Sequence, residues 1–334
     1  MILRWLAALI LVGMGSVFIL AEYGRTQLEP AATEPAPRLF DVHPGNTFAS
    51  VARRLEDEGL IRDARLATWL ARYNEMDGRL HVGQYELSPH QSTQEILEVI
   101  TQGQVKTWRV TLPEGSRAEE IAERLAASGL VDGEQFKAAL RNPALAEELD
   151  VPTTDFEGYL YPDTYWLPQG LSPEEVVRIL VGQFDRVWEA EIRTQAEETG
   201  LSRNEVVTLA SIVEKETAAP PERARIAAVF LNRLRKGMRL ETDPTVIYGI
   251  EDFDGNLRRK HLRDKRNPYN TYQHFGLPPG PIANPGLAAL RSVVNPEETD
   301  YLYFVSRNDG THVFSRTYGE HTKAVDEYQR RKRR

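Results

Sequence analysis

The N-terminal half of this 334-residue chain contains one pattern of glycines and apolar residues twice, at a constant offset of 70 residues. Gly45, Val51, Leu55 and the tripeptide Gly59-Leu60-Ile61 recur as Gly115, Ile121, Leu125 and Gly129-Leu130-Val131. In each copy a glycine turn precedes an amphipathic helix that ends at a second glycine. The repeat predicts a duplicated strand–helix–helix element, and hence a chain of mixed α and β structure.

The first copy predicts a compact subdomain of short elements. We expect a strand at Asp41–Val42, helices over Thr47–Glu58, Arg62–Asn74 and Ser92–Thr101, and a short strand at Gly83–Ser88. In the second helix, the apolar side is expected to comprise Leu66, Trp69 and Leu70. No aromatic cluster in this region marks a sugar-binding platform, so a purely structural duplication and a glycan-binding one both remain open.

The first twenty residues are almost entirely apolar. Ile2 to Leu20 carries only Arg4 as a charge, and at about 1.5 Å per residue such a helix just crosses a bilayer core of roughly 30 Å. A cleaved signal peptide is the alternative, but no clean small-x-small site precedes Glu22. We therefore expect an uncleaved anchor over residues 1–24, with a cytoplasmic N-terminus. Residues 25–38 include the run EPAATEPAPR and are expected to form an extended linker.

The composition narrows the class of protein. A net charge of -8 argues against a nucleic-acid binder, which is normally basic. The chain has no cysteine, which excludes thiol catalysis, disulfides and cysteine-ligated zinc. Its seven histidines are scattered and form no HExxH motif. We therefore expect neither a metal nor another cofactor.

A candidate catalytic carboxylate lies in the stretch Ser202 to Gly249. Ser202 and Glu205 form a capping box, so a helix is expected to begin at Arg203. Apolar residues at helical spacing give this helix a buried face, and Glu214 lies at the edge of that face. Partial desolvation there would raise the pKa of Glu214, as a general acid near neutral pH requires. A Glu followed by Lys215 and Glu216 is also typical of a solvated helix face, which is the structural alternative.

Three features favour catalysis over that alternative. The helix is short and ends at Pro220-Pro221, which places Glu214 near the opening of a site rather than in the middle of the core. A second helix follows directly and stops at Gly237. The segment LETDPTVIYG then supplies a polar turn with an aromatic residue, which is suited to line a cleft.

Other segments have both a structural and a functional interpretation. Asp155–Leu167 is dense in aromatic residues, which suits either core packing or stacking on sugars, with Glu157 and Asp163 as hydroxyl acceptors. Asp243 is suited to cap a helix or to bind substrate. Asn270 either orients an acetamido group or closes an Asx turn. Gly276–Gly286 is a stiff, proline-rich loop, followed by a helix over Pro285–Val294.

The remaining segments are read as structural. A long amphipathic helix is expected over Pro173–Thr199 and a β-hairpin over residues 301–314. His321 is placed on a last helix over Gly319–Arg330, and the chain ends in the basic run RRKRR.

Several motifs together resemble one known family. ASIVEKET (Ala210–Thr217), LNRLRKGMRLETDPTVIYG (Leu231–Gly249), YNTY (Tyr269–Tyr272) and GLPPGPIANPG (Gly276–Gly286) are similar to the MltG/YceG family of endolytic murein transglycosylases. The motifs occur in order across most of the chain. The resemblance implies a bacterial inner-membrane enzyme that cuts nascent peptidoglycan outside the cytoplasm, with Glu214 as general acid and base.

The resemblance also assigns domains and partners. It implies a LysM-like subdomain over residues 39–107 and a catalytic domain over 108–334, with a repeat-like segment at 110–150. It implies glycan strands as substrate and penicillin-binding synthases as possible partners. Weaker candidates for substrate binding are Glu157, Asp163, Thr242, Asp243, Tyr248, Asn270 and Tyr272.

Two alternatives to a lytic enzyme remain. Glycosidases normally use two carboxylates, so Asp243 or Glu157 as a partner of Glu214 would indicate a hydrolytic muramidase. A non-catalytic protein that tethers a wall-synthesis complex to glycan is the other alternative.

Overall fold

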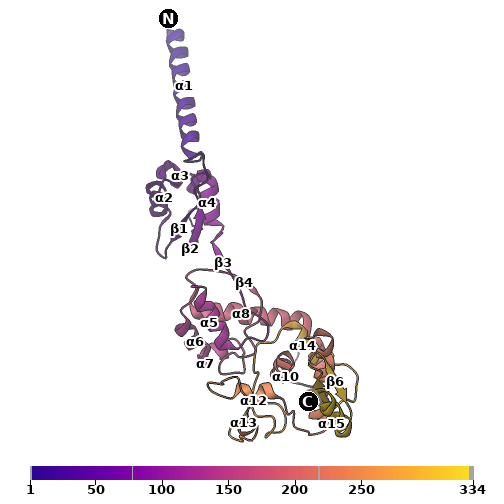
Figure 1. The fold of residues 1–334 in the computed structure, drawn as a ribbon. Coiled ribbons are helices and arrows are strands. Elements are labelled where there is room, and N and C mark those ends of the chain that lie inside the picture. Colours follow the sequence, from indigo (N-terminus) through magenta and orange to yellow (C-terminus); the bar gives the residue numbers. More distant parts are fainter. Residues whose placement is uncertain (1, 77, 217–218, 331–334) are drawn as a thin grey trace. The chain divides into compact units, whose positions relative to one another are not determined.

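The computed structural model describes residues 2–76, 78–216 and 219–330, with the backbone alone for residues 2–12. Thr217 of the EKET motif and the tail residues 331–334 therefore lie outside the described residues. The chain divides into two compact units, which are Met1–Trp108 with Trp166–Gly170, and Arg109–Tyr165 with Leu171–Arg334. Mixed α and β structure is confirmed, because short two-stranded sheets accompany many helices (Figure 1).

The first unit begins with a single helix, α1 (Ile2–Leu28). It runs four residues into the predicted linker, because no helix breaker occurs before Pro30. The rest of the linker lies against its own unit, since Ala32 N donates to Pro89 O and Arg62 donates to Pro30 O. None of the helices in the described part of the chain combines the length and apolar character needed to cross a bilayer. The membrane anchor therefore stays a prediction.

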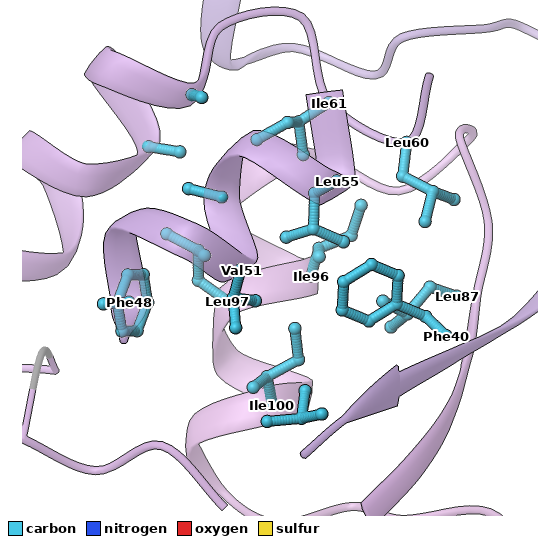
Figure 2. Close-up of a cluster of buried hydrophobic side chains, with 14 of the residues drawn as sticks. Phe40, Phe48, Val51, Leu55, Leu60, Ile61, Leu87, Ile96, Leu97 and Ile100 are labelled. Atoms are coloured by element: carbon cyan, nitrogen blue, oxygen red, sulfur yellow. The ribbon is translucent and has the colours of Figure 1, made fainter. Parts of the chain in front are cut away.

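The remainder of this unit is a strand–helix–helix–strand arrangement. β1 (Arg38–Val42) pairs antiparallel with β2 (Gly83–Leu87), and α2 (Phe48–Asp57) and α3 (Ala64–Tyr73) lie between them in sequence. α4 (Thr93–Thr101) follows, capped by Ser92 and Glu95. Figure 2 shows the core that these elements share, in which Val51, Leu55 and Ile96 are fully buried. The predicted elements are confirmed to within two or three residues; no finding tests the LysM-like assignment.

α3 corrects one prediction. Its buried residues are Ala64, Ala67 and Ala71, while Trp69 is 57% exposed and stacks on Tyr73 at 5.3 Å. Three small side chains let the helix pack closely on the core, and Leu70 packs against its edge, so the larger rings of Trp69 and Tyr73 lie on the outer side. The expectation that Trp69 points inward was wrong.

The predicted duplication is visible in the structure. β3 (Thr107–Thr111), α5 (Ala118–Ala127), α6 (Gly133–Leu140) and β4 (Thr164–Pro168) repeat the order of β1, α2, α3 and β2, with α7 (Pro143–Glu148) added. β3 pairs with β4. α2 and α5 are offset by 70 residues at both ends, and Gly45 and Gly115 both have positive φ, at 81° and 73°.

The second unit continues with a long helical segment. α8 (Pro173–Val187), a π-helical turn η1 (Trp188–Ile192) and α9 (Arg193–Thr199) occupy the region predicted as one helix. The aromatic segment before it is largely core, because Phe156, Tyr159, Tyr161 and Tyr165 are at most 8% exposed. Core packing is therefore the interpretation that the structure supports for these four rings.

α10 (Arg203–Glu216), α11 (Arg223–Arg235) and α14 (Leu287–Val294) pack together at the centre of this unit. A short 3-10 turn, η2 (Pro220–Glu222), precedes α11, and α12 (Asp243–Tyr248) and α13 (Arg259–Leu262) follow it. The hairpin of β5 (Tyr303–Ser306) and β6 (His312–Ser315) is confirmed. The chain ends in α15 (Tyr318–Val325) and the π-helical turn η3 (Asp326–Arg330).

Candidate active site

α10 holds Glu214 at the end of a buried helix. Ser202 and Glu205 exchange hydrogen bonds at its start, as the capping box predicts. Every residue from Val206 to Val213 is buried, which fixes the helix firmly within the second unit. Glu214 is the first residue beyond this buried run, so its carboxylate emerges at the boundary of the core.

The Glu214 side chain is only 6% exposed, and two donors hold it. Arg223 Nη2, at the start of α11, lies 3.2 Å from Oε1. The backbone N–H of Gly286, at the start of α14, donates to Oε2 at 3.1 Å. The carboxylate is thus fixed by the two helices that pack on α10.

Burial raises the pKa of Glu214 above its ordinary value. The Gly286 N–H and the Arg223 guanidinium act in the opposite direction, because both favour the charged carboxylate. The nearby carboxylate of Glu114 raises the pKa further. The net shift of the pKa is upward, which is the direction that a general acid requires.

The turn between β3 and α5 lies directly against Glu214. A Cβ on Gly115 would be 3.4 Å from Glu214 Cγ, and Lys215 Nζ donates to Gly115 O at 3.1 Å. Gly115 N donates to Asn284 O, and Asn284 N donates to Ser116 O, so this turn pairs with the proline-rich loop. The second copy of the repeat therefore forms one wall of the site.

Glu157 lies behind that wall and is 4% exposed. Its carboxylate accepts hydrogen bonds from Ala118 N at 3.1 Å, from Asn284 Nδ2 at 2.9 Å and from Tyr248 Oη at 3.3 Å. Burial raises the pKa of Glu157 to about 8, although the hydrogen bond from Ala118 lowers it. Its contacts join α5, α12 and the proline-rich loop.

Tyr248 forms the edge of a partly open surface beside Glu157. Its ring lies 4.7 Å from Tyr269, and the Arg117 guanidinium is 5.0 Å from the ring centroid. A cavity of about 250 Å³ is lined by Arg117, Glu157 and Tyr248, with Asp155 at its side. Aromatic, cationic and carboxylate groups are thus brought together here.

Thr242, Asp243 and Tyr272 are brought together in a different place. Together with Glu216 they line a cavity of about 410 Å³. Burial raises the pKa of Glu216. Thr242 Oγ1 donates to Glu216, and Tyr272 Oη donates to Asp243 at 2.8 Å. Asp243 is the first residue of α12 and Thr242 is its N-cap, so the expectation that Asp243 caps the helix was wrong. Its carboxylate is oriented instead by the Tyr272 hydroxyl.

The side chains of the other two candidates, Asn270 and Asp163, form hydrogen bonds within the protein. Asn270 is fully buried; its amide donates to Asp264 O at 2.8 Å and its carbonyl accepts from Tyr272 N. This is the Asx turn that the sequence offered as one alternative. Asp163 is exposed near the start of β4 and accepts from Thr164 N and Gln183 Nε2.

Sequence reasoning missed four residues that contact or support Glu214. Arg223, Gly286, Glu114 and Asn284 come from segments far apart in the chain. Two sequence features could have pointed to them. Asn284 and Gly286 lie in the GLPPGPIANPG motif, and Glu114 directly precedes Gly115 of the repeat. Within residues 2–76, 78–216 and 219–330, no group of three His, Asp or Glu side chains is placed to hold a metal ion.

The chain matches a known family. The family model described as the YceG-like family matches residues 40–327, which is most of the chain. The chain belongs to the YceG-like family. An endolytic murein transglycosylase of Bacillus subtilis is 30% identical over 332 residues, covering 94% of this chain and 91% of that protein.

Two further relatives agree with this family. An endolytic murein transglycosylase of Streptococcus pneumoniae serotype 2 is 29% identical over 315 residues, which cover 85% of this chain and 57% of that protein. The crystal structure of a YceG-like protein of Listeria monocytogenes superposes with a TM-score of 0.60 and 31% identity. It covers 87% of this chain and 100% of the Listeria chain.

Proposed function

We propose that this protein is a lytic murein transglycosylase that cleaves the MurNAc–GlcNAc β-1,4 bond within peptidoglycan strands. The observation that carries the proposal is Glu214, a buried carboxylate with a raised pKa, fixed by Gly286 and Arg223 in a chain of the YceG-like family. The names of the B. subtilis and S. pneumoniae relatives support the same activity.

One carboxylate suffices for this reaction. Protonated Glu214 gives its proton to the glycosidic oxygen as the bond from that oxygen to muramic acid C1 breaks. The C6 hydroxyl of the same muramic acid then attacks C1 and closes a 1,6-anhydro ring, while Glu214 takes the hydroxyl proton. No water is consumed and Glu214 returns to its starting state. Intramolecular attack supplies much of the acceleration through proximity.

The finer parts of the proposal rest on the sequence. The apolar N-terminal segment would anchor the enzyme in the inner membrane, with the catalytic part outside the cytoplasm, where cleavage limits glycan elongation. Penicillin-binding synthases are its proposed partners through the family resemblance.

Substrate binding is proposed for two regions of the second unit. Tyr248, with Tyr269 and Arg117, offers stacking and hydrogen bonding beside Glu157. Thr242, Asp243 and Tyr272 offer polar groups around the larger cavity. The carboxylate of Glu157 and the amide of Asn270 are engaged by protein groups, so we propose that they shape the site by holding its loops.

A hydrolytic muramidase is the second candidate function, and Glu114 is the observation that favours it. Glu114 and Glu214 contact the same glycine, which places their carboxylates within about 8 Å of each other. Retaining glycosidases hold their two carboxylates about 5–5.5 Å apart and inverting ones about 6.5–9.5 Å apart, so this limit is compatible with a hydrolytic pair. Glu114, rather than Asp243 or Glu157, is therefore the partner that a hydrolase would use.

Glu214→Gln tests whether the protein is an enzyme at all. The variant is expected to lose at least 100-fold in turnover of uncrosslinked glycan strands, because Gln cannot donate a carboxylic proton. Glycan binding by co-sedimentation and the thermal unfolding midpoint should change little. Full turnover in the variant would refute the assignment, and strand binding without turnover by the unmodified protein would favour a tether.

A further inference from the structure

Gly286 contacts two carboxylates at once. Its N–H donates to Glu214 Oε2 at 3.1 Å. On its α-carbon side, a Cβ would lie only 2.0 Å from Glu114 Oε1. Glu114 therefore occupies the space that any side chain at position 286 would need, directly beside the residue that orients Glu214.

The two carboxylates have different surroundings. Glu114 is exposed to solvent, whereas the Glu214 side chain is 6% exposed. Glu114 raises the pKa of Glu214, because a like charge nearby disfavours ionisation of the buried carboxylate. Paired carboxylates whose environments differ in this way commonly divide into a charged and a protonated member.

The repeat shows that the turn does not need Glu114 to form. The position equivalent to Glu114 in the first copy is Pro44, which precedes Gly45 as Glu114 precedes Gly115. Both glycines adopt positive φ and both turns lead into a helix. A carboxylate at this position is thus a property of the copy that lies against Glu214.

The charged groups around Glu214 act in opposite directions. Arg223, on α11, lowers the pKa of Glu214, and Glu114, on the β3–α5 turn, raises it. Lys215, the neighbour on α10, directs its ammonium to Gly115 O. Removing Glu114 would therefore leave burial alone to oppose the Gly286 amide and Arg223, so the pKa of Glu214 should fall.

We propose that Glu114 is a positioning residue that acts through Glu214, keeping the Glu214 side chain protonated between reaction cycles and the Gly286 amide directed at it. This inference rests on the proposed function, because it assigns Glu214 the acid role. Glu114 itself transfers no proton and forms no bond with substrate.

The test is a direct titration of Glu214 in the full-length protein. With ¹³C-labelled glutamate, the Glu214 carboxyl signal is assigned by its absence in Glu214→Gln, and its midpoint is followed by NMR. Glu114→Gln is expected to lower that midpoint by about 0.5–1 pH unit. Arg223→Gln should raise it. Glu123→Gln, an equal charge change at an exposed position on α5, should leave it in place.

Enzyme kinetics supply the second readout. In Glu114→Gln the alkaline limb of the kcat/KM profile should move to lower pH, with a loss of about three- to tenfold above neutrality that is recovered in acid. Glu114→Asp keeps the charge and should restore most of the profile. Glu114→Ala replaces Glu114→Gln if that variant does not fold. An unchanged Glu214 midpoint in the variant that removes the charge would overturn the inference. The NMR titration requires no turnover, so it tests the role of Glu114 independently of the proposed activity. Failure of the proposed activity would instead show as an unmodified protein that does not cleave glycan.

Discussion

Gly286 is the residue on which the geometry of the site depends. It supplies a donor to Glu214 and leaves room for Glu114 because it has no side chain. Its φ of -79° is accessible to any residue, so the requirement is for space and not for backbone freedom. A small side chain at position 286 should therefore reduce catalytic activity more than the stability of the fold.

Gly286→Ala is expected to lower kcat/KM about tenfold with a stability change below about 1 kcal/mol, because the flexible tip of Glu114 moves aside. Steady-state kinetics and chemical denaturation measure the two effects. In a Glu114→Ala background the same substitution should cost little more, since the clash is gone. Additive losses in the double variant would show that Gly286 acts independently of Glu114.

Glu214 could be predicted from local sequence, whereas its neighbours could not. The capping box at Ser202 and the apolar stripe of α10 locate a carboxylate at the edge of a buried face. Arg223, Glu114 and Gly286 reach it through tertiary packing, which spacing along the chain does not encode. For the same reason the sequence indicates Asp243 or Glu157 as a second carboxylate, while the structure brings Glu114 next to Gly286 and Glu214.

At the scale of elements, the site depends on a junction behind Glu214. Glu157 joins the start of α5, the end of α12 and Asn284 of the proline-rich loop. Gly158 makes the adjoining contact, with a φ of +88° and a virtual Cβ 2.5 Å from Pro281 and 2.8 Å from Val207 on α10. These elements hold the wall formed by the β3–α5 turn against Glu214.

Because Glu157 titrates, the stability of this junction depends on pH. Its folded-state pKa of about 8 exceeds the ordinary value of 4.5, so its contribution to stability is complete below about pH 4.5 and is lost as pH rises through 8. Relative to Glu157→Gln, the unmodified protein should lose a few kcal/mol of unfolding free energy between pH 5 and pH 8.5. Urea denaturation at both pH values measures this. A constant difference between the two proteins would refute the assignment.

Gly158→Ala tests the packing of the same junction. Both the left-handed backbone and the contacts with Pro281 and Val207 oppose a methyl group, so we expect a loss of about 3 kcal/mol or more. Gly200→Ala is the matched control, because Gly200 has a φ of +73° but nothing within 4 Å of its virtual Cβ. Its loss should be about 1 kcal/mol. Equal losses at both positions, by chemical denaturation, would mean that the junction is not closely packed.

On the scale of the whole molecule, the two copies of the repeat have diverged. Both retain the glycine turn and the first helix at a constant offset, which is why sequence periodicity predicted them. The outward position of Trp69 and the internal role of Asn270 were not predictable, because each depends on which neighbours pack against it. The second copy lies against Glu214.

Removal of residues 1–37 tests the proposed anchor. The shortened protein should keep its turnover within about twofold, because the described site lies wholly in the second unit, and should remain in the aqueous phase. The full-length protein should float with phospholipid vesicles in a density gradient. A full-length protein that stays in the aqueous fractions would contradict the anchor without affecting the active-site assignment.

The mass of the new glycan ends tests the central claim most directly. Uncrosslinked strands are incubated with the unmodified protein and with Glu214→Gln, and the products are analysed by mass spectrometry. We predict ends about 18 Da lighter than reducing ends, as 1,6-anhydroMurNAc requires, and none with the variant. Reducing ends of full mass would contradict the lytic mechanism and would identify a hydrolase, with Glu114 as the candidate second carboxylate.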